Sequence, residues 1–359
     1  MKKKVMLGMS GGVDSSVAAL LLKNAGYEVT GVTLRLRPDQ YMTECSAGGC
    51  CSLEDIDDAR RVAYKLGIEH LVFNFTDIFQ QTVMDYFVSE YEQGRTPNPC
   101  IACNRHVKFN AMLKRAAELG FDYIATGHYA CITQNKQGRW LLKKTSATKD
   151  QSYVLYSMTQ FQLEHTLLPL ATYTKPQIRA LAQQAELPVA QKPDSQEICF
   201  VPDKDYAGFI QRYTGKIPQP GNFTDQNGNI LGKHKGIVHY TIGQRKGLGM
   251  SFGEPMFVTE IDAGQNRVVL GKAGSQYANT LIAGDLNWIA FPDLAAPLKA
   301  TAQTRYQAPT APVSLSPLPN GTVHVAFEQP QRSITPGQAV VFYHDDFVLG
   351  GGTILHKES

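Results

Sequence analysis

The chain has 359 residues, a formal net charge of +3 and a hydrophobic content of 43%. This length fits two or three domains of ordinary size, and the hydrophobic content is sufficient for their cores. A charge so near neutrality excludes a protein that is basic throughout, so a nucleic-acid surface would need locally gathered basic residues. The apolar run Val5–Met9 is too short for a signal peptide, and no stretch approaches the roughly 20 apolar residues of a membrane span. We therefore expect a soluble, cytoplasmic protein with no membrane partner.

Apolar runs alternate with helical patterns through the first 130 residues. The apolar runs predict strands at 4–9, 27–36, 70–75 and 122–130. The helical patterns predict helices at 15–26, 53–67, 77–94 and 109–120, with another at 174–187. Gly26 and Gly67 mark the C-terminal ends of the first two helices. A Ser52–Asp55 capping box marks the start of the second helix, and Thr174 as N-cap with Pro176 in the first turn marks the start of the last one. This alternation predicts an α/β fold with a doubly wound parallel sheet.

After about Tyr206 the sequence becomes rich in Gly, Pro and Asn, and short alternating runs follow. These runs predict strands at 237–243, 255–262, 267–271, 299–306, 313–328 and 339–345, with Asn320-Gly321 as a hairpin turn. We expect two small, barrel-like β domains. The expected organisation is a nucleotide-binding and catalytic domain at 1–205, a central β domain at 206–277 and a C-terminal β domain at 278–359.

The stretch GMSGGVDSS lies between the first expected strand and the first expected helix. Gly11 and Gly12 let the backbone approach an anion closely, and three nearby serines add hydroxyl donors. Asp14 would repel a phosphate unless it helps to hold a divalent cation such as Mg²⁺. For a bare Gly-Gly pair, an ordinary glycine turn capped by serine would be the favoured interpretation. The stretch matches neither G-x-x-x-x-G-K-[ST] nor G-x-G-x-x-G.

In its strand–loop–helix setting, S-G-G-x-D-S-S resembles the PP-loop of the ATP pyrophosphatases, whose fold is like that of the adenine nucleotide α-hydrolases. The resemblance implies binding of ATP and its cleavage to AMP and pyrophosphate while a substrate oxygen is adenylated. In an open α/β sheet the ligand lies at the carboxyl ends of the central strands. The residues expected at the nucleotide are Gly8, Met9, Ser10, Gly11, Gly12, Val13, Asp14, Ser15, Ser16, Leu34 and Gly127.

All seven cysteines precede residue 200, and their odd number argues against a disulfide framework. For Cys100 and Cys103 three interpretations compete. A zinc site lacks a second cysteine pair, although His106 and His128 could contribute, and a redox dithiol would follow a strand directly. A reactive thiolate is favoured by the positive residues after Cys103 and by the expected helix start. Cys199 lies in a polar stretch, where a small buried apolar residue is the simpler interpretation.

Several segments together resemble the tRNA-specific 2-thiouridylases along almost the whole chain. They are GMSGGVDSSVAALLL, GCCSLEDIDDARRVAYKLGI, GRTPNPCIACNRHVKF, ATGHYA, KDQSYVLY, KPDSQEICFV and HYTIGQRKGLG. The resemblance implies that Cys103 is the nucleophile and that Cys199 carries a persulfide and forms a transient disulfide with Cys103. It implies contacts to the target base or tRNA from Asn98, Pro99, Cys100, His128, Lys149, Asp150, Gln151, Arg305, Tyr306 and Gln338.

The reaction implied is ATP-dependent 2-thiolation of the wobble uridine, U34, of a tRNA. Its partners would be the tRNA anticodon loop, an upstream sulfur donor (a cysteine desulfurase or relay protein) and a reductant. Some members of the family have Asp at the position of Cys100, whereas this chain has a third cysteine there. Cys100, Cys103 and Cys199 could therefore hold an iron–sulfur cluster, and sulfur could travel through it instead of as a persulfide. The persulfide route is the interpretation we favour. The roles of Cys45, Cys50, Cys51 and Cys131 stay open.

Basic residues gather in three short clusters: Lys143, Lys144 and Lys149; Lys233, His234 and Lys235; Arg245 and Lys246. Taken separately, each cluster is better explained as a solvated surface. Phosphate contacts from these residues would carry no sequence information. Two other functions are open at this point. A PP-loop ligase or amidotransferase acting on a small molecule would need ATP but neither Cys103 nor Cys199. An RNA- or iron–sulfur-binding protein could use the loop only as a scaffold.

Overall fold

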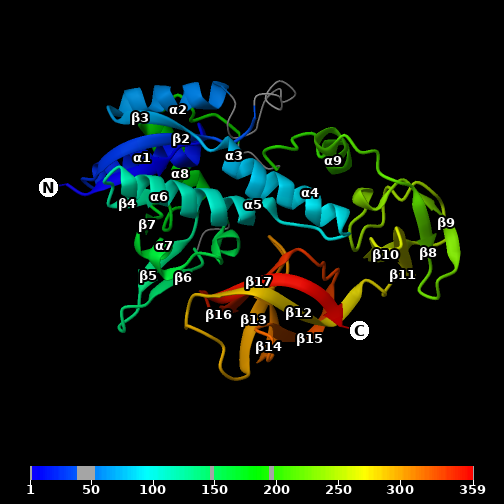
Figure 1. Ribbon diagram of the computed structural model, residues 1–359. Coiled ribbons are helices and arrows are strands. Elements are labelled where there is room, and N and C mark those ends of the chain that lie inside the picture. The colour runs from blue at the N-terminus through cyan, green and yellow to red at the C-terminus, as the bar shows by residue number, and fades with distance from the viewer. Residues whose placement is uncertain (1, 39–52, 146–148, 194–197, 359) are drawn as a thin grey trace. The chain divides into compact units, whose positions relative to one another are not determined.

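The computed structural model describes residues 2–38, 53–145, 149–193 and 198–358, and Figure 1 labels its elements. The chain divides into two compact units. The first comprises Met1–Met84, Cys100–Pro202 and Asp346–Val348, and the second comprises Asp85–Pro99, Asp203–Asp345 and Leu349–Ser359. The predicted Ser52–Asp55 capping box, together with Cys45, Cys50 and Cys51, involves residues outside the described ranges.

A five-stranded sheet in the order β3-β2-β1-β4-β7 forms the centre of the first unit, and its neighbouring strands all pair in parallel. Its strands are β1 (Lys4–Gly8), β2 (Glu28–Arg35), β3 (Glu69–Asn74), β4 (Tyr123–Ala125) and β7 (Thr166–Leu167). The strand order reverses between β1 and β4. Val5 and its neighbours in β1 pair with β2 on one side and with β4 on the other. In open α/β sheets this reversal point is where ligands bind. The predicted doubly wound sheet is confirmed.

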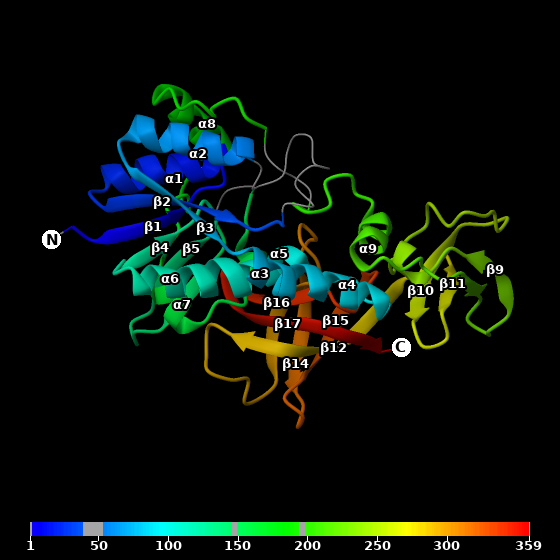
Figure 2. The same cartoon turned by 45° about the horizontal axis from the view of Figure 1, so that its top comes forward.

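Helices cover both faces of this sheet (Figure 2). One face carries α1 (Val13–Asn24), α2 (Leu53–Leu66) and α8 (Lys175–Gln184), whose apolar side chains form one core with the strands. The ends predicted from glycine are confirmed, since Gly26 and Gly67 have φ of +89° and +61° directly after α1 and α2. Thr174 caps α8 as predicted, and its N–H donates to Gln177 Oε1 at 2.8 Å.

The helix predicted at 109–120 begins ten residues earlier. It runs as α5 (Pro99–Ala102), the π-helix η3 (Cys103–Ala111) and α6 (Met112–Glu118). Proline suits the first position of a helix, because its missing N–H would be unpaired there and its φ is already helical. The helix predicted at 77–94 is likewise composite: α3 (Thr76–Phe79), the π-helix η2 (Gln80–Met84) and α4 (Asp85–Glu92). Cys103 therefore lies within a helix and not just before one.

The strand predicted at 122–130 is also wrong in extent, because β4 ends at Ala125. The next five residues turn across the carboxyl edge of the sheet. Two further strands that the sequence analysis did not predict then form a hairpin, β5 (Cys131–Gln134) and β6 (Trp140–Lys143). The first unit is completed by the 3₁₀ turn η4 (Ser152–Leu155) and by α7 (Gln160–Glu164).

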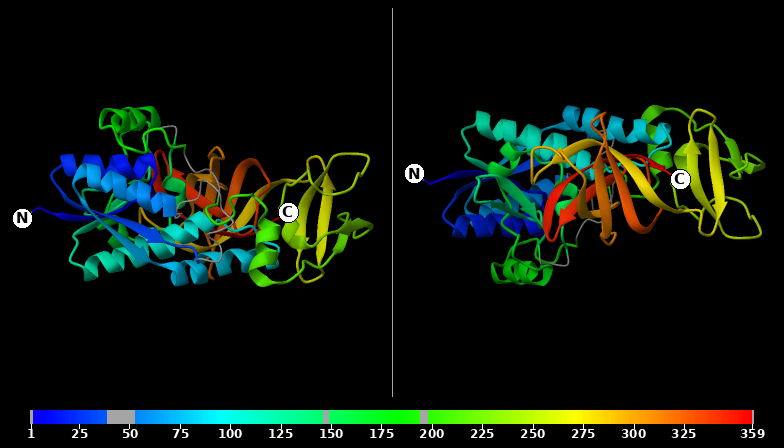
Figure 3. Two further views of the ribbon diagram at one scale, coloured as in Figure 1. Left: turned by 90° about the horizontal axis from the view of Figure 1, so that it is seen from above. Right: turned by 90° about the horizontal axis from the view of Figure 1, so that it is seen from below.

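The second unit contains two β structures, whose strands Figure 3 shows from above and below. A four-stranded sheet has the order β10-β11-β8-β9, with β8 (Gly221–Thr224), β9 (Ile230–His234), β10 (Met256–Asp262) and β11 (Arg267–Lys272). Besides α4, the unit contains α9 (Tyr206–Thr214) and the 3₁₀ turn η5 (Ile237–His239). The strand predicted at 237–243 is therefore wrong. Gly236 and Gly243, with φ of +121° and +85°, bound this segment in a conformation that strands do not use.

The second β structure is a closed six-stranded barrel in the order β12-β15-β14-β13-β16-β17, closed by pairing of β12 with β17. Its strands are β12 (Tyr277–Trp288), β13 (Leu298–Gln303), β14 (Ala311–Pro317), β15 (Val323–Arg332), β16 (Ala339–His344) and β17 (Phe347–Glu358). Inward-facing Leu281, Val325 and Phe342 belong to its core. The predicted turn at Asn320-Gly321 is present between β14 and β15, with Gly321 at φ +75°. Across the described residues, the helices are all too short or too polar to cross a membrane.

Candidate active site

The loop between β1 and α1 is held in one conformation by glycine and by serine hydroxyls. Gly11 has a φ of +69°, and a Cβ there would lie 2.4 Å from the carbonyl oxygen of Asp55 in α2. Ser15 and Ser16 donate their hydroxyls to the carbonyl oxygen of Gly12, at 3.2 and 2.8 Å. Ser16 is fully buried, so its hydroxyl supports the loop. The loop brings backbone N–H groups and the start of α1 to the reversal point of the sheet.

A cavity of about 270 Å³ opens beside this loop. The predicted residues that line it are Gly8, Met9, Ser10, Gly12, Val13, Asp14, Ser15, Leu34, Gly127, His128, Lys149 and Gln151. The lining also includes residues that were not predicted from the sequence: Val32, Thr33, Leu36, Asp55, Lys108, Met112, Thr126, Lys192 and Pro193. Gly11 and Ser16 are absent from the lining and act behind it. An apolar wall from β2 and the polar loop facing it suit a flat base joined to phosphates.

The segment after β4 closes the cavity on the side of α1. A Cβ on Gly127 would lie 2.9 Å from the amide nitrogen of Ser15, so only glycine allows this approach. Thr126 Oγ1 and His128 Nδ1 are 2.8 Å apart and form a buried hydrogen bond. Burial lowers the pKa of His128 well below its usual value, and the charges of Lys108 and Lys149 lower it further. His128 is therefore a neutral imidazole at physiological pH.

Asp14 is the centre of a charged cluster in the first turn of α1. Its Oδ1 accepts hydrogen bonds from Lys175 Nζ at 2.6 Å and from the hydroxyl of Tyr129 at 2.7 Å. Its Oδ2 accepts one from Lys149 Nζ at 3.2 Å, and this ammonium also lies 5.3 Å from the centre of the Tyr129 ring. Lys175 was missed because no local sequence signal joins it to a residue 161 positions away.

Asp150 and Gln151, which the resemblance assigns to tRNA, have internal contacts here. Gln151 forms two hydrogen bonds with the backbone of Tyr129: its N–H donates to the carbonyl oxygen at 2.8 Å, and its Oε1 accepts from the N–H at 3.0 Å. Asp150 accepts hydrogen bonds from the N–H of Thr145 at 3.0 Å and from the hydroxyl of Ser152 at 2.6 Å. Burial raises the pKa of Asp150, although these hydrogen bonds oppose the shift. Both residues fix the loop that presents Lys149.

The thiols of Cys100, Cys103 and Cys199 lie in the same unit as the cavity but do not line it. Cys103 is buried at the first position of the π-helix, Cys100 is exposed, and Cys199 is half-buried. Phe200, next to Cys199, packs edge-on against Phe79 of α3 with ring centres 5.7 Å apart, and α3 also packs against the π-helix. The segments that carry Cys103 and Cys199 thus share one packing partner. Short π-helical segments are frequent at functional sites.

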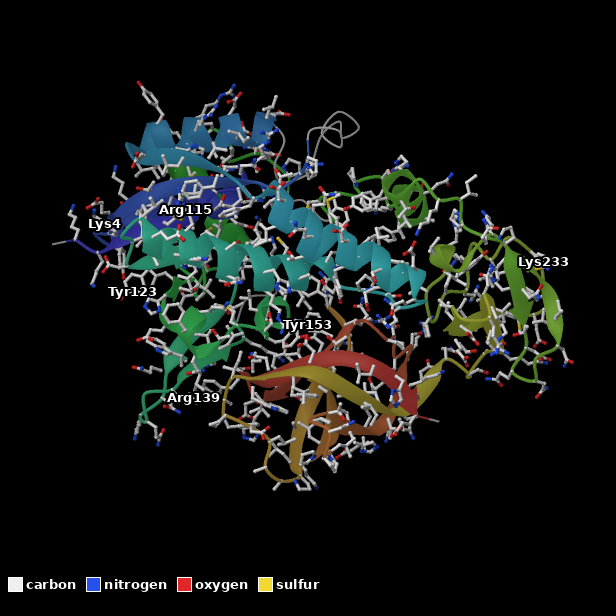
Figure 4. The ribbon with its side chains drawn as sticks, in the orientation of Figure 1. Lys4, Arg115, Tyr123, Arg139, Tyr153 and Lys233 are labelled. Atoms are coloured by element: carbon white, nitrogen blue, oxygen red, sulfur yellow. The ribbon has the colours of Figure 1, made fainter. Side chains whose placement is uncertain are left out.

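The π-helix also reaches the cavity and the loop at 149–155. Lys108, from the π-helix, and Met112, the first residue of α6, line the cavity. The buried amide of Asn104 donates to the carbonyl oxygen of Val154 at 3.0 Å. Figure 4 labels Tyr153, which belongs to η4, and Lys4 and Tyr123, which mark the opposite, amino edge of the sheet. One composite helix therefore supplies both the candidate nucleophile and a wall of the nucleotide cavity.

In the second unit, Gln338 holds the segment that leads to Asn98 and Pro99. Its Nε2 donates to the carbonyl oxygens of Thr96 and Pro97, at 2.8 and 3.1 Å. The N–H of Thr96 donates to the carbonyl oxygen of Pro336 at 2.9 Å. Arg305 and Tyr306, also assigned to tRNA by resemblance, lie in the connection between β13 and β14, where Arg305 is exposed.

The donor groups at the site do not fit a resident metal. Both cavity carboxylates are already paired with lysine, Asp14 as described and Asp55 with Lys192 Nζ at 2.8 Å. Within the described ranges, no group of three or more His, Cys, Asp and Glu side chains is arranged to hold a metal ion. The arrangement therefore gives no support to a Mg²⁺ site at Asp14 or to an iron–sulfur cluster on Cys100, Cys103 and Cys199.

In the predicted basic cluster around His234, only the two lysines are exposed to solvent. His234 is buried, its Nε2 lies 3.1 Å from the carbonyl oxygen of Asn266, and burial lowers its pKa. Lys233, Lys235, Arg245 and Lys246 are exposed in the second unit. They remain candidates for phosphate contacts.

Comparison with known sequences finds matches to family models along almost the whole chain. Residues 3–203 match the family described as the tRNA methyl transferase HUP domain, 207–272 its PRC-barrel domain, and 278–354 the aminomethyltransferase beta-barrel domain. A tRNA-specific 2-thiouridylase MnmA of Acetivibrio thermocellus is 56% identical over 98% of this chain and 99% of its own length. The chain belongs to the tRNA-specific 2-thiouridylase family.

Other members of the family are similar over equal lengths. The enzyme named tRNA-specific 2-thiouridylase MnmA from Clostridium acetobutylicum is 53% identical over 99% of this chain and 100% of its own. The one from Clostridioides difficile is 52% identical over 99% of this chain and 98% of its own. Because both chains of each pair are covered almost completely, the relationship extends through the α/β unit and the β structures alike.

Proposed function

We propose that this protein is a tRNA-uridine 2-sulfurtransferase that converts the wobble uridine, U34, of tRNA to 2-thiouridine with cleavage of ATP to AMP and pyrophosphate. Its full-length membership in the 2-thiouridylase family supports this function. The structural observation that carries the proposal is the composite helix with Cys103 at the start of its π-helical segment and with Lys108 and Met112 in the wall of the nucleotide cavity.

Replacing a carbonyl oxygen of uracil by sulfur needs a better leaving group than oxide. In the proposed first step, the C2 oxygen of the uracil attacks the α-phosphorus of ATP, and the bond from this phosphorus to the pyrophosphate breaks. The glycine loop and Lys149 stabilise the departing pyrophosphate, and Mg²⁺ enters bound to the phosphates of the substrate. The adenylated base then carries AMP, which leaves readily.

In the second step, the terminal sulfur of a persulfide on Cys199 attacks C2, and the bond from C2 to the oxygen of AMP breaks. The Cys103 thiolate attacks the inner sulfur of the persulfide, so that a Cys103–Cys199 disulfide forms and both electrons of the broken S–S bond pass to the transferred sulfur. Alternatively, Cys103 first releases hydrosulfide, which attacks C2. A reductant restores the two thiols by thiol–disulfide exchange. A cysteine desulfurase or relay protein reloads Cys199.

The remaining site residues divide between the base and the tRNA backbone. Asn98, Pro99 and Cys100 are proposed to meet the target base, which flips from a single-stranded loop at little cost. His128, Asp150, Gln151, Arg305, Tyr306 and Gln338 are proposed as tRNA contacts on the ground of the family resemblance alone. The resemblance assigns Lys149 to tRNA as well, but its place in the cavity lining supports the phosphate role proposed above. We propose 1–205 as the catalytic domain, with 206–277 and 278–359 as β domains that bind tRNA, and the cytoplasm as the place of action.

The decisive experiment labels the uracil C2 oxygen of a tRNA substrate with ¹⁸O. The purified protein is incubated with this tRNA, MgATP, a cysteine desulfurase with cysteine as the source of persulfide sulfur, and a thiol reductant, and the nucleosides and AMP are analysed by mass spectrometry. We expect 2-thiouridine to form in equal amount to AMP, with the label in the phosphate of AMP. Unlabelled AMP would reject the adenylation step. ATP cleavage that does not require tRNA, or AMP release without any 2-thiouridine, would reject the proposed function as a whole.

A further inference from the structure

Asp14 is an unexpected residue in a phosphate-binding loop, since a carboxylate repels a phosphate at close range. The structure shows how its charge is offset. Two ammonium groups, from segments far apart in the sequence, bind its two oxygens, Lys175 at 2.6 Å on Oδ1 and Lys149 at 3.2 Å on Oδ2. These two positive charges face the single negative charge of Asp14 and offset it.

The two lysines differ in their access to the cavity. Lys149 lines the cavity and has 31% of its side chain exposed. Lys175 is absent from the lining, has 17% exposed, and makes the shorter bond to Asp14. It is the first residue of α8, which packs against α1, so its backbone is fixed relative to Asp14. Lys149, by contrast, stands on the loop that Gln151 ties to Tyr129.

Tyr129 holds the carboxylate between the two lysines. Its ring is fully buried, and its hydroxyl donates to Asp14 Oδ1 at 2.7 Å, on the oxygen that also binds Lys175. Within the described part of the chain, Oδ1 therefore accepts hydrogen bonds from two donors, Tyr129 and Lys175, whereas Oδ2 accepts one longer hydrogen bond, from Lys149. Loss of the bond on Oδ2 would leave the orientation of Asp14 unchanged.

We propose that Lys175 is the permanent counter-ion of Asp14, a positioning residue that frees Lys149 to move from Asp14 to the phosphates of ATP. This inference rests on the proposed use of ATP. A phosphate chain offers Lys149 more negative charge than a carboxylate already bound by Lys175 and Tyr129. Without Lys175, Asp14 would retain Lys149 and would also repel the phosphates directly. A residue that only fastened α8 to α1 would affect stability but not the binding of nucleotide.

A charge-rescue series tests this role by measuring the dissociation constant of ATP and the inhibition constant of pyrophosphate. We expect Lys175→Met to weaken the binding of both ligands at least about tenfold. Adding Asp14→Asn to Lys175→Met removes the charge that the lysine offset, and we expect affinity to return to within about threefold of that of Asp14→Asn alone. The matched control is Lys65→Met, which removes an exposed ion pair with Glu186 just beyond the other end of α8 and should leave both constants unchanged.

Two results would overturn the role of Lys175. One is wild-type affinity in Lys175→Met, and the other is a double variant that binds as weakly as Lys175→Met. Thermal unfolding of each variant separates lost binding from lost folding, and the double variant retains the test if the single one is unstable. Failure of the wild-type protein and the Lys65→Met control to bind ATP would instead refute the proposed function.

Discussion

Substituting Gly11 by alanine is the most informative change in the phosphate loop. The alanine would have to keep a φ of +69°, and its Cβ would lie 2.4 Å from the carbonyl oxygen and 2.9 Å from the Cα of Asp55. These are backbone atoms of α2, so no side-chain rotation can relieve the overlap. Either the loop moves away from α2, or α2 moves away from the sheet.

The expected cost has two parts. A left-handed conformation costs a residue other than glycine about 1–2 kcal/mol. Overpacking in a well-packed core costs about 1–3 kcal/mol more, which gives about 2–5 kcal/mol for Gly11→Ala. Gly26→Ala is the matched control, because Gly26 has a φ of +89° and a Cβ there would meet nothing within 4 Å. The control should cost only the first part, about 1–2 kcal/mol.

The assay is chemical unfolding of both variants together with calorimetric titration by ATP. Gly11→Ala should be the less stable variant and should bind ATP at least about tenfold more weakly, since the amide groups of the loop are displaced from the phosphates. Gly26→Ala should bind ATP as the wild type does. Equal stabilities of the two variants, with wild-type ATP affinity in Gly11→Ala, would refute the assigned packing of the loop against α2.

Three further outcomes follow from the same contacts. Gln338→Leu removes two hydrogen bonds to the backbone of Thr96 and Pro97; we expect a lower kcat for thiolation with an unchanged KM for ATP, and an unchanged kcat would contradict this. Burial lowers the pKa of His128, so the unfolded state binds a proton at a higher pH than the native state does. Stability should therefore fall as the pH drops through about 6.5, and the fall should be smaller in His128→Gln; equal slopes would contradict the assignment. Asn104→Leu should reduce stability by about 1–3 kcal/mol in urea unfolding, because the carbonyl oxygen of Val154 loses its donor, and no loss would contradict this.

Local patterns predicted the central part of the fold well. The strands β1, β2 and β3 are each a short apolar run that precedes a helical pattern, and Gly26 and Gly67 end their helices as expected. The phosphate loop was predictable because its conformation is set within nine residues, by glycines with room for close approach and by serines that bond back to Gly12. Such features depend on nearest neighbours and are visible in a single sequence.

Other parts of the fold were predicted wrongly although the sequence contained a signal for them, because a second pattern nearby indicated a different structure. Asn98 and Pro99 are typical of a helix start, yet the helix was predicted only from residue 109. At 237–243 the apolar alternation indicated a strand, but the backbone of Gly236 and Gly243 determines a turn. Contacts between distant segments, such as that of Lys175 with Asp14, leave no local pattern.

The central claim is that Cys103 and Cys199 both serve the uridine that the nucleotide site activates. The most direct measurement is single-turnover thiolation of tRNA by Cys103→Ser and Cys199→Ser, with ATP binding measured on the same preparations. Both variants should bind ATP with wild-type affinity and form no 2-thiouridine. Thiolation at the wild-type rate by either variant would contradict the account.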